Sequence, residues 1–185
     1  MKKLMTIVLA VVLIAGFTST SNAQISIGAK AGIALPMGTF GDAVGMGFGG
    51  SAIGEYAINE NMAVGLNVGY YTFGGKTIGT IDLPSFSVIP ILADFKYFFQ
   101  TEGFRPYVGA GIGMYMSSQT VPAITLMGIT LSPETTVSNS DFGFEPKVGF
   151  WMGDGFKYGA CIDYNIISDA NHLGISVGVI YPLGK

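Results

Sequence analysis

The sequence predicts an all-β protein: an eight-stranded antiparallel up-and-down transmembrane β-barrel, preceded by a cleavable signal peptide. Three observations predict this fold. The 185 residues are 49% hydrophobic and 11% charged, with 28 glycines, whereas soluble domains carry about 25% charged residues. Apolar residues recur at every second position in eight segments, which is the period of a strand with two different faces. Charged residues within these segments keep the phase of the glycines.

The first 23 residues predict the signal peptide. Lys2 and Lys3 form a positive start, and residues 4–17 form an apolar segment that is shorter than the roughly 20 residues a spanning helix needs. Small residues at 21 and 23 give a cleavage site. We therefore predict a signal peptide over 1–23 and an outer-membrane β-barrel domain over 24–185.

Period-two alternation defines each predicted strand. One face of every segment is apolar and the other is rich in glycine and serine, as in residues 25–36, where Ile25, Ile27 and Ile33 alternate with Gly28 and Gly32. Segments of this length suit a tilted strand that crosses a bilayer. The eight predicted strands are residues 25–36, 44–56, 62–73, 86–99, 105–116, 141–152, 156–165 and 173–183.

Charge placement indicates which face meets lipid. A Lys or Arg at the bilayer midplane costs about 2–4 kcal/mol, so the uncharged apolar face suits lipid and the glycine face suits a narrow lumen. A soluble ligand-binding barrel is the alternative, but its solvent face would carry far more charge. The charged residues on the glycine face are Lys30, Glu55, Asp94, Lys96, Arg105, Asp141, Glu145, Lys147, Lys157 and Asp163.

These lumen charges predict a network of ion pairs. A three-residue turn centred on Asp154 would place Glu145 opposite Asp163, with Lys147 diagonal to Asp163 and able to bridge both carboxylates. The alternative is that some of the groups reach the barrel rims. Eight strands enclose a lumen about wide enough for side chains, so we expect no passage for solutes. The predicted network is Lys30, Glu55, Asp94, Lys96, Arg105, Glu145, Lys147, Lys157 and Asp163.

Connection lengths and aromatic residues predict the orientation. Longer connections follow the first, third, fifth and seventh predicted strands, which places both termini on the periplasmic side. Pro90 and Pro146 lie inside predicted strands and each predicts a bulge or local break. The predicted periplasmic aromatic girdle is Tyr56, Tyr97, Phe99, Phe156, Tyr158 and Tyr181, and the predicted outer one is Phe48, Tyr70, Phe86, Phe142 and Tyr164.

The long third loop, residues 117–140, contains an apolar β-prone stretch. It predicts a hairpin that extends the flanking strands and offers an edge for strand addition by a partner. The second loop, with Ile78, Ile81 and Leu83, could pack against it. The alternative is a loop that folds on itself or rests on lipid. The candidate partner-binding residues are Ile124, Leu126, Met127, Ile129 and Leu131.

The remaining motifs point to no catalytic residue, cofactor, metal or nucleic acid. Scarce charge excludes a nucleic-acid-binding chain, and the lone Cys161 excludes a disulfide framework and acts as an inward-facing filler. The glycines from Gly45 to Gly50 match a dinucleotide fingerprint, but no helix follows them. His172, the single histidine, lies near Ser168 and Asp169. We expect a solvated loop histidine, with a lipid-modifying hydrolase as the alternative.

Two adjacent predicted strands carry a family resemblance. Residues 89–99, IPILADFKYFF, followed after a short turn by RPYVGAGIG at 105–113, resemble the fourth and fifth strands of OmpX-like, opacity-type and OmpA-transmembrane-like outer-membrane barrels of Gram-negative bacteria. The chain departs from that family at its last residues, Leu183-Gly184-Lys185, which lack an aromatic terminus.

The resemblance implies a location in the outer membrane, contacts with lipid and lipopolysaccharide, and a monomeric, non-enzymatic protein. Its implied role is structural, or one of surface interaction as in adhesins, with protein partners reached through the second and third loops. Two alternatives stay open. They are a lipid A deacylase or acyltransferase, and a small-solute channel.

Overall fold

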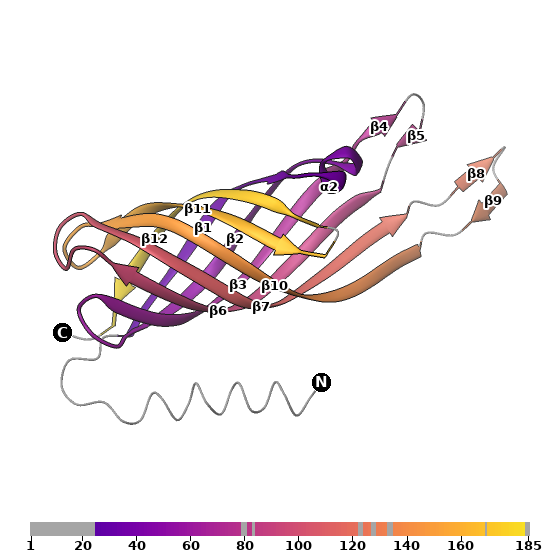
Figure 1. The fold of residues 1–185 in the computed structure, drawn as a ribbon. Helices are drawn as coiled ribbons and strands as arrows, with labels where there is room; N and C mark the ends of the chain where they lie inside the picture. The colour runs from indigo at the N-terminus through magenta and orange to yellow at the C-terminus, as the bar shows by residue number, and fades with distance from the viewer. Residues whose placement is uncertain are drawn as a thin grey trace, which may run out of the picture.

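The computed structural model describes residues 25–78, 81–82, 84–121, 124–126, 129–132, 135–168 and 170–183. Eight long strands close into a barrel, ordered β1-β12-β11-β10-β7-β6-β3-β2, with antiparallel neighbours throughout (Figure 1). This confirms the predicted up-and-down barrel, while the predicted signal peptide over 1–23 lies outside the described residues. The strands are β1 (Ile25–Pro36), β2 (Val44–Ala57), β3 (Met62–Gly75), β6 (Ser85–Phe98), β7 (Arg105–Val121), β10 (Thr135–Met152), β11 (Lys157–Ile167) and β12 (His172–Pro182).

The two ends of the barrel differ in their connections (Figure 1). At the short-turn end, residues 58–61, 99–104 and 153–156 join neighbouring strands. At the other, outer end lie helix α2 (Thr39–Ala43) and two hairpins, β4 (Thr77–Ile78) with β5 (Ile81–Asp82) and β8 (Ile124–Leu126) with β9 (Ile129–Ser132). The sequence did not predict α2. None of the described helices is long and apolar enough to cross a membrane.

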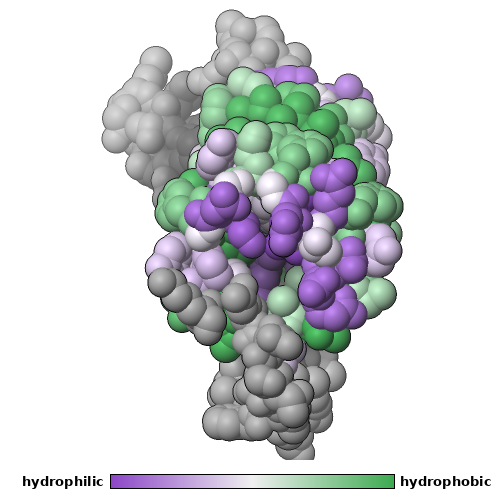
Figure 2. All heavy atoms as spheres, turned by 90° about the vertical axis from the view of Figure 1, so that its left-hand side faces the viewer, coloured by the Kyte–Doolittle hydropathy of each residue, from purple (hydrophilic) through white to green (hydrophobic). Residues whose placement is uncertain are grey.

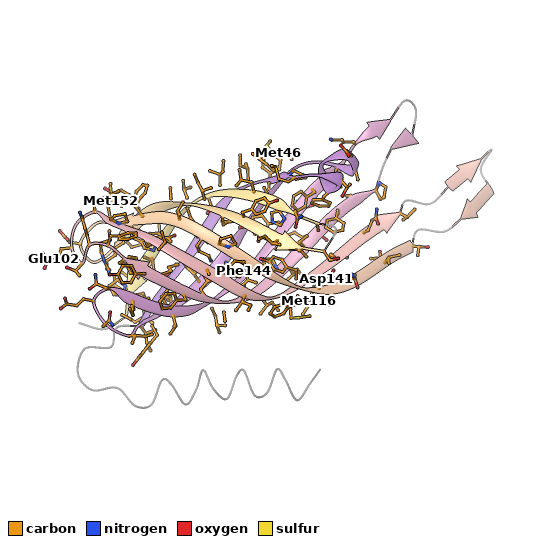
Figure 3. All side chains as sticks on the ribbon, viewed as in Figure 1. Met46, Glu102, Met116, Asp141, Phe144 and Met152 are labelled. Carbon is orange, nitrogen blue, oxygen red and sulfur yellow. The ribbon has the colours of Figure 1, made fainter. Side chains whose placement is uncertain are left out.

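Apolar side chains cover the outer wall, as the alternation predicted. Met46, Met116 and Phe144 stand on the outside of the ribbon (Figure 3) and are 42–46% exposed. Val148 is 52% exposed, while Lys147, one position before it, is buried. Since this wall carries large apolar groups without charge, it suits hydrocarbon and would be unfavourable in water.

Most of the aromatic residues follow the predicted girdles, whereas Tyr56 and Tyr164 are half-buried and Phe86 faces the lumen. Exposed aromatic side chains surround the short-turn end, and Phe48, Tyr70 and Phe142 are exposed nearer the outer end. Phe86 was assigned to the outer girdle, and that assignment is wrong. It shares the phase of the buried lumen residues on β6, and its ring packs on Phe40, with centroids 5.0 Å apart. The exposed aromatic residues at the short-turn end are Tyr97, Phe99, Phe156, Tyr158 and Tyr181.

Strand register differs from prediction at the turn between β10 and β11. Lys147 lies directly opposite Asp163, and the same register places Glu145 opposite Asn165. The predicted Glu145–Asp163 pairing is therefore wrong. The connection covers 153–156, and glycines at 153 and 155 adopt positive φ angles of 116° and 79°, a backbone that glycine adopts readily.

Both internal prolines interrupt pairing without shifting register. The β3–β6 pairs pass from Val68–Ile91 to Tyr71–Val88, so they skip Pro90. The β10–β11 pairs likewise skip Pro146. Because proline has no N–H to donate, the ladder breaks on the side that its nitrogen faces. The predicted local break is present, and neither site has a bulge.

Candidate functional site in the barrel lumen

The lumen is filled in three layers. An apolar cluster lies toward the outer end and a second one toward the short-turn end. Along β6 the order is Leu92 in the outer cluster, then Asp94 and Lys96, then Phe98 in the other cluster. The polar layer is thus sealed by apolar side chains at both ends. Its members are Lys30, Ser51, Asn67, Asp94, Lys96, Glu145, Lys147, Asp163, Asn165 and Ser176.

Lys147 is the hub of the polar layer. Its Nζ donates to both carboxylate oxygens of Asp94, at 2.8 and 2.9 Å. It also forms an ion pair with Glu145 Oε1 at 2.7 Å, and its side chain is 0% exposed. Lys96 forms a second ion pair with Glu55. These contacts link β10, β6 and β2 across the lumen, because opposite charges attract more strongly in a buried site than in bulk water.

Glycines on β7 make this cross-lumen contact possible. Asp94 on β6 and Glu145 on β10 both pair with Gly111. A Cβ atom on Gly111 would lie 2.7 Å from Asp94 Oδ1 and 3.4 Å from Glu145 Cβ, and one on Gly109 would lie 3.3 Å from Lys147 Cγ. The side chains of β6 and β10 therefore meet over β7, in space that any larger residue would fill.

Other predicted network members lie apart from the hub. Asp163 accepts from Asn165 Nδ2 at 2.7 Å, and Lys147 does not bridge it to Glu145, so that part of the prediction is wrong. Lys30 is buried, and within the described residues it has no ion pair within 4 Å. Arg105 and Lys157 are half-buried at the short-turn rim, as the alternative of rim-seeking side chains predicted for some of the groups.

Two uncharged residues, Tyr115 and Asn165, form a hydrogen-bonded chain to Asp163 that was not predicted from the sequence. The Tyr115 hydroxyl donates to Asn165 Oδ1 at 2.8 Å, and Asn165 in turn binds Asp163. Asn165 lies two residues after Asp163 on β11 and therefore faces the same side of the strand. This alternation could have identified it from the sequence as a lumen residue. Asp141 lies farther out on β10, where Asn139 Nδ2 donates to it at 2.8 Å.

His172 is buried inside the barrel, so the expected solvated histidine is wrong. It is 3% exposed because β12 begins with it, in lumen phase. Its ring packs edge-on to Phe73 with centroids 5.4 Å apart, and its Nδ1 lies 3.0 Å from the Ala170 carbonyl oxygen. Ser168 is exposed, and Asp169 lies outside the described residues. Cys161 is buried at the inward position predicted for it.

The predicted partner-binding residues lie at the outer hairpins. Met127 and Leu83 lie outside the described residues. Strands β8 and β9, which hold the other four candidates, pair with each other beyond the end of the barrel (Figure 1). The hairpin is thus present, and its role in binding stays a prediction. The four are Ile124, Leu126, Ile129 and Leu131.

Comparison with known proteins matches the architecture. A family described as "Outer membrane protein beta-barrel domain" matches residues 5–181. No curated protein matches the chain. Neisserial surface protein A is 18% identical with a TM-score of 0.62, covering 87% of this chain and 99% of its own. The Yersinia pestis attachment invasion locus protein, Ail, is 16% identical with a TM-score of 0.55, covering 87% and 97%. A major outer membrane protein of Thermus thermophilus is 12% identical with a TM-score of 0.58, covering 88% and 100%.

Proposed function

Because the chain belongs to the outer membrane protein β-barrel domain family, we propose that it is a monomeric, non-enzymatic barrel with a lumen closed to solutes. It contacts outer-membrane lipid and lipopolysaccharide along its wall and presents its long loops at the cell surface. The protein is located in the outer membrane of a Gram-negative bacterium.

The sealed polar layer is the observation that carries this proposal. An ion entering from either end would have to displace an apolar cluster before it reached Lys147. It would then compete with the Lys147 ammonium, which already contacts Asp94 at 2.8 Å and Glu145 at 2.7 Å. Side chains that fill a barrel of this size leave no continuous water path.

Planar-bilayer recording tests the closed lumen. Residues 24–185 are refolded and added to bilayers, and insertion is verified by heat-modifiable gel mobility of the same sample. We expect no stable conductance steps. Large, stable openings that pass small solutes would contradict the proposal and favour the channel alternative.

We further propose that the outer part of β10 receives a partner strand. Residues 136–142 pair with β7, whereas the β10–β11 pairs begin at Gly143–Ile167. Residues 136–140 are exposed. The segment contains no lysine and no proline, the residues that usually protect an open strand edge. An extended peptide can add to such an edge through main-chain hydrogen bonds.

A proline substitution tests the open edge of β10. The ladder to β11 breaks at Pro146 while the ladder to β7 continues, so the Pro146 nitrogen faces β11. Because N–H groups alternate sides along a strand, Ser138 presents its N–H to the same open edge. Ser138→Pro should abolish adhesion of cells that display the protein, and Ser138→Thr should retain it. Unchanged adhesion in Ser138→Pro would exclude this role, and unchanged adhesion after deletion of residues 121–131 would exclude binding through the β8–β9 hairpin.

Charge at the outer end narrows the kind of partner. Ail has been solved with the heparin analogue sucrose octasulfate. The outer connections of the present chain contain Lys76 as their one basic residue and carry Asp42, Asp82, Glu134 and Asp169. A polyanion would be repelled by these carboxylates, so an uncharged or basic peptide is the better fit.

The buried histidine supports the non-enzymatic part of the proposal. A hydrolase that acts on lipid needs its histidine beside a nucleophile that substrate can reach. His172 instead packs on Phe73 within the sealed lumen. Lipase and deacylase assays on the purified protein should show no activity. Activity that is lost in His172→Ala would overturn this reading.

A further inference from the structure

A polar recess opens at the short-turn end of the barrel, and Glu55 in its wall pairs with Lys96 of the polar layer. Its cavity volume is about 50 Å³ and it is open to solvent. Figure 2 views this end and shows hydrophilic residues around a hollow. The wall includes Glu55, Phe98, Arg105, Trp151 and Lys157, which come from five different long strands. This end faces the periplasm, because short turns lie on that side of outer-membrane barrels.

The charges in the wall are unequal. Glu55 is the one acidic residue that lines the recess, and it is already paired with Lys96. Arg105 and Lys157 are close enough for their charges to repel. Glu55 in the wall attracts both of them, and Asp154 in the adjoining turn also attracts Lys157. In the described part of the chain, the Lys157 side chain has no hydrogen bond and no ion pair within 4 Å. The wall therefore holds two cations and a single carboxylate, which is already paired with Lys96.

Arg105 is held in a fixed position. Its Nε donates to the Gln100 carbonyl at 3.3 Å and its Nη2 to the Glu60 carbonyl at 3.0 Å. Its guanidinium carbon lies 4.3 Å from the centre of the Phe98 ring. Guanidinium has five N–H donors, so this anchoring leaves others free at the recess.

Trp151 adds a buried donor that lacks an acceptor. Its side chain lines the recess and is 3% exposed, and among the described residues its indole nitrogen has no hydrogen-bond partner. Buried polar groups in folded proteins are normally satisfied. The residues of the wall thus supply a pre-positioned guanidinium, an ammonium without a hydrogen bond and, from Trp151, a buried indole N–H without an acceptor.

We propose that this recess is a binding site for an anionic oxygen group, a carboxylate or a phosphate, that enters from the periplasm. Both groups present several acceptor oxygens to an Arg fork and a Lys point charge, which form short, charge-assisted hydrogen bonds with them. The site lies outside the sealed lumen, so binding requires no opening of the barrel.

The single tryptophan of the chain provides a local probe. The indole ¹⁵N–¹H resonance of Trp151 is followed in the refolded barrel in nanodiscs during separate titrations with inorganic phosphate, N-acetylalanine and N-acetylalanine amide. We expect a saturable shift with phosphate, with N-acetylalanine or with both, and no shift with the amide. The response identifies the source: phosphate alone indicates a phosphate ligand, and N-acetylalanine alone indicates a peptide carboxylate.

Matched charge variants separate binding from general electrostatics. Lys157→Gln removes a side chain without a partner, so its heat-modifiable mobility should match the wild type, and its affinity should fall at least tenfold. Lys76→Gln removes the same charge at the outer end and should bind as the wild type does. Arg105→Lys keeps the charge and loses the fork, and should also weaken binding. The proposal is overturned if no saturable shift occurs, or if sodium chloride at equal ionic strength moves the resonance equally in wild type and Lys157→Gln.

Discussion

Replacing Lys147 by methionine tests whether the polar layer stabilises the barrel. The change keeps most of the side-chain volume and removes the cation that Asp94 binds at 2.8 Å and Glu145 at 2.7 Å. Both acidic side chains are 4% exposed, so each would keep a buried charge without a partner. Removing one member of a buried ion pair costs about 3–5 kcal/mol. We therefore expect Lys147→Met to lower the free energy of unfolding by about 4 kcal/mol.

The measurement is urea unfolding in lipid vesicles at pH 7, with the folded fraction read from gel mobility without boiling. A triple variant, Asp94→Asn with Glu145→Gln and Lys147→Met, should recover most of the loss, because neither acidic position then keeps a charge that has lost its cation. Lys157→Met at the rim should cost less than about 1 kcal/mol. A loss below about 1 kcal/mol for Lys147→Met, or no recovery in the triple variant, would refute the assigned role of the ion pairs.

Three further changes test other parts of the structure in the same unfolding assay. Gly111→Ala places a Cβ 2.7 Å from a carboxylate oxygen of the polar layer, and it should lower the free energy of unfolding by about 1–3 kcal/mol. In the control Gly54→Ala the new Cβ meets no atom within 4 Å, so this change should be neutral or stabilising. Phe40→Ala should cost about 3 kcal/mol, because the ring closes the outer cluster; an unchanged midpoint would show that α2 is dispensable. Val148→Lys on the lipid-facing wall should lower the free energy of unfolding by about 2–4 kcal/mol. Val137→Lys, on the same strand beyond the barrel wall, should cost little. Equal costs for the two variants would show that the membrane boundary along β10 is assigned incorrectly.

Strand positions were accessible from the sequence because two independent signals agree there. Alternation fixes the phase of each strand, and the charges fix which phase is inside. Residues 25–36 and 44–56 were predicted almost to the observed bounds of β1 and β2. The same phase correctly placed Lys147 and Asp94 inside the barrel.

The contacts between these residues could not be read from phase alone. The Lys147–Asp94 pair joins strands that are not neighbours, and it forms because glycines on β7 leave space between them. The register of β10 against β11 depends on two glycine conformations in a turn, which a single sequence does not specify. His172 was misplaced because the last outer connection is shorter than predicted, so β12 starts one residue earlier, in lumen phase.

The position of the ion pairs bears on how the barrel assembles. Those described join β2, β6 and β10, whereas the two strands from opposite ends of the chain, β1 and β12, meet mainly through small and apolar residues, with Lys30 facing Gly178. Pairing of β1 with β12 therefore requires no matching of opposite charges. We expect the ion pairs among β2, β6 and β10 to form while the sheet is still open. Backbone hydrogen bonding between β1 and β12 then closes the barrel.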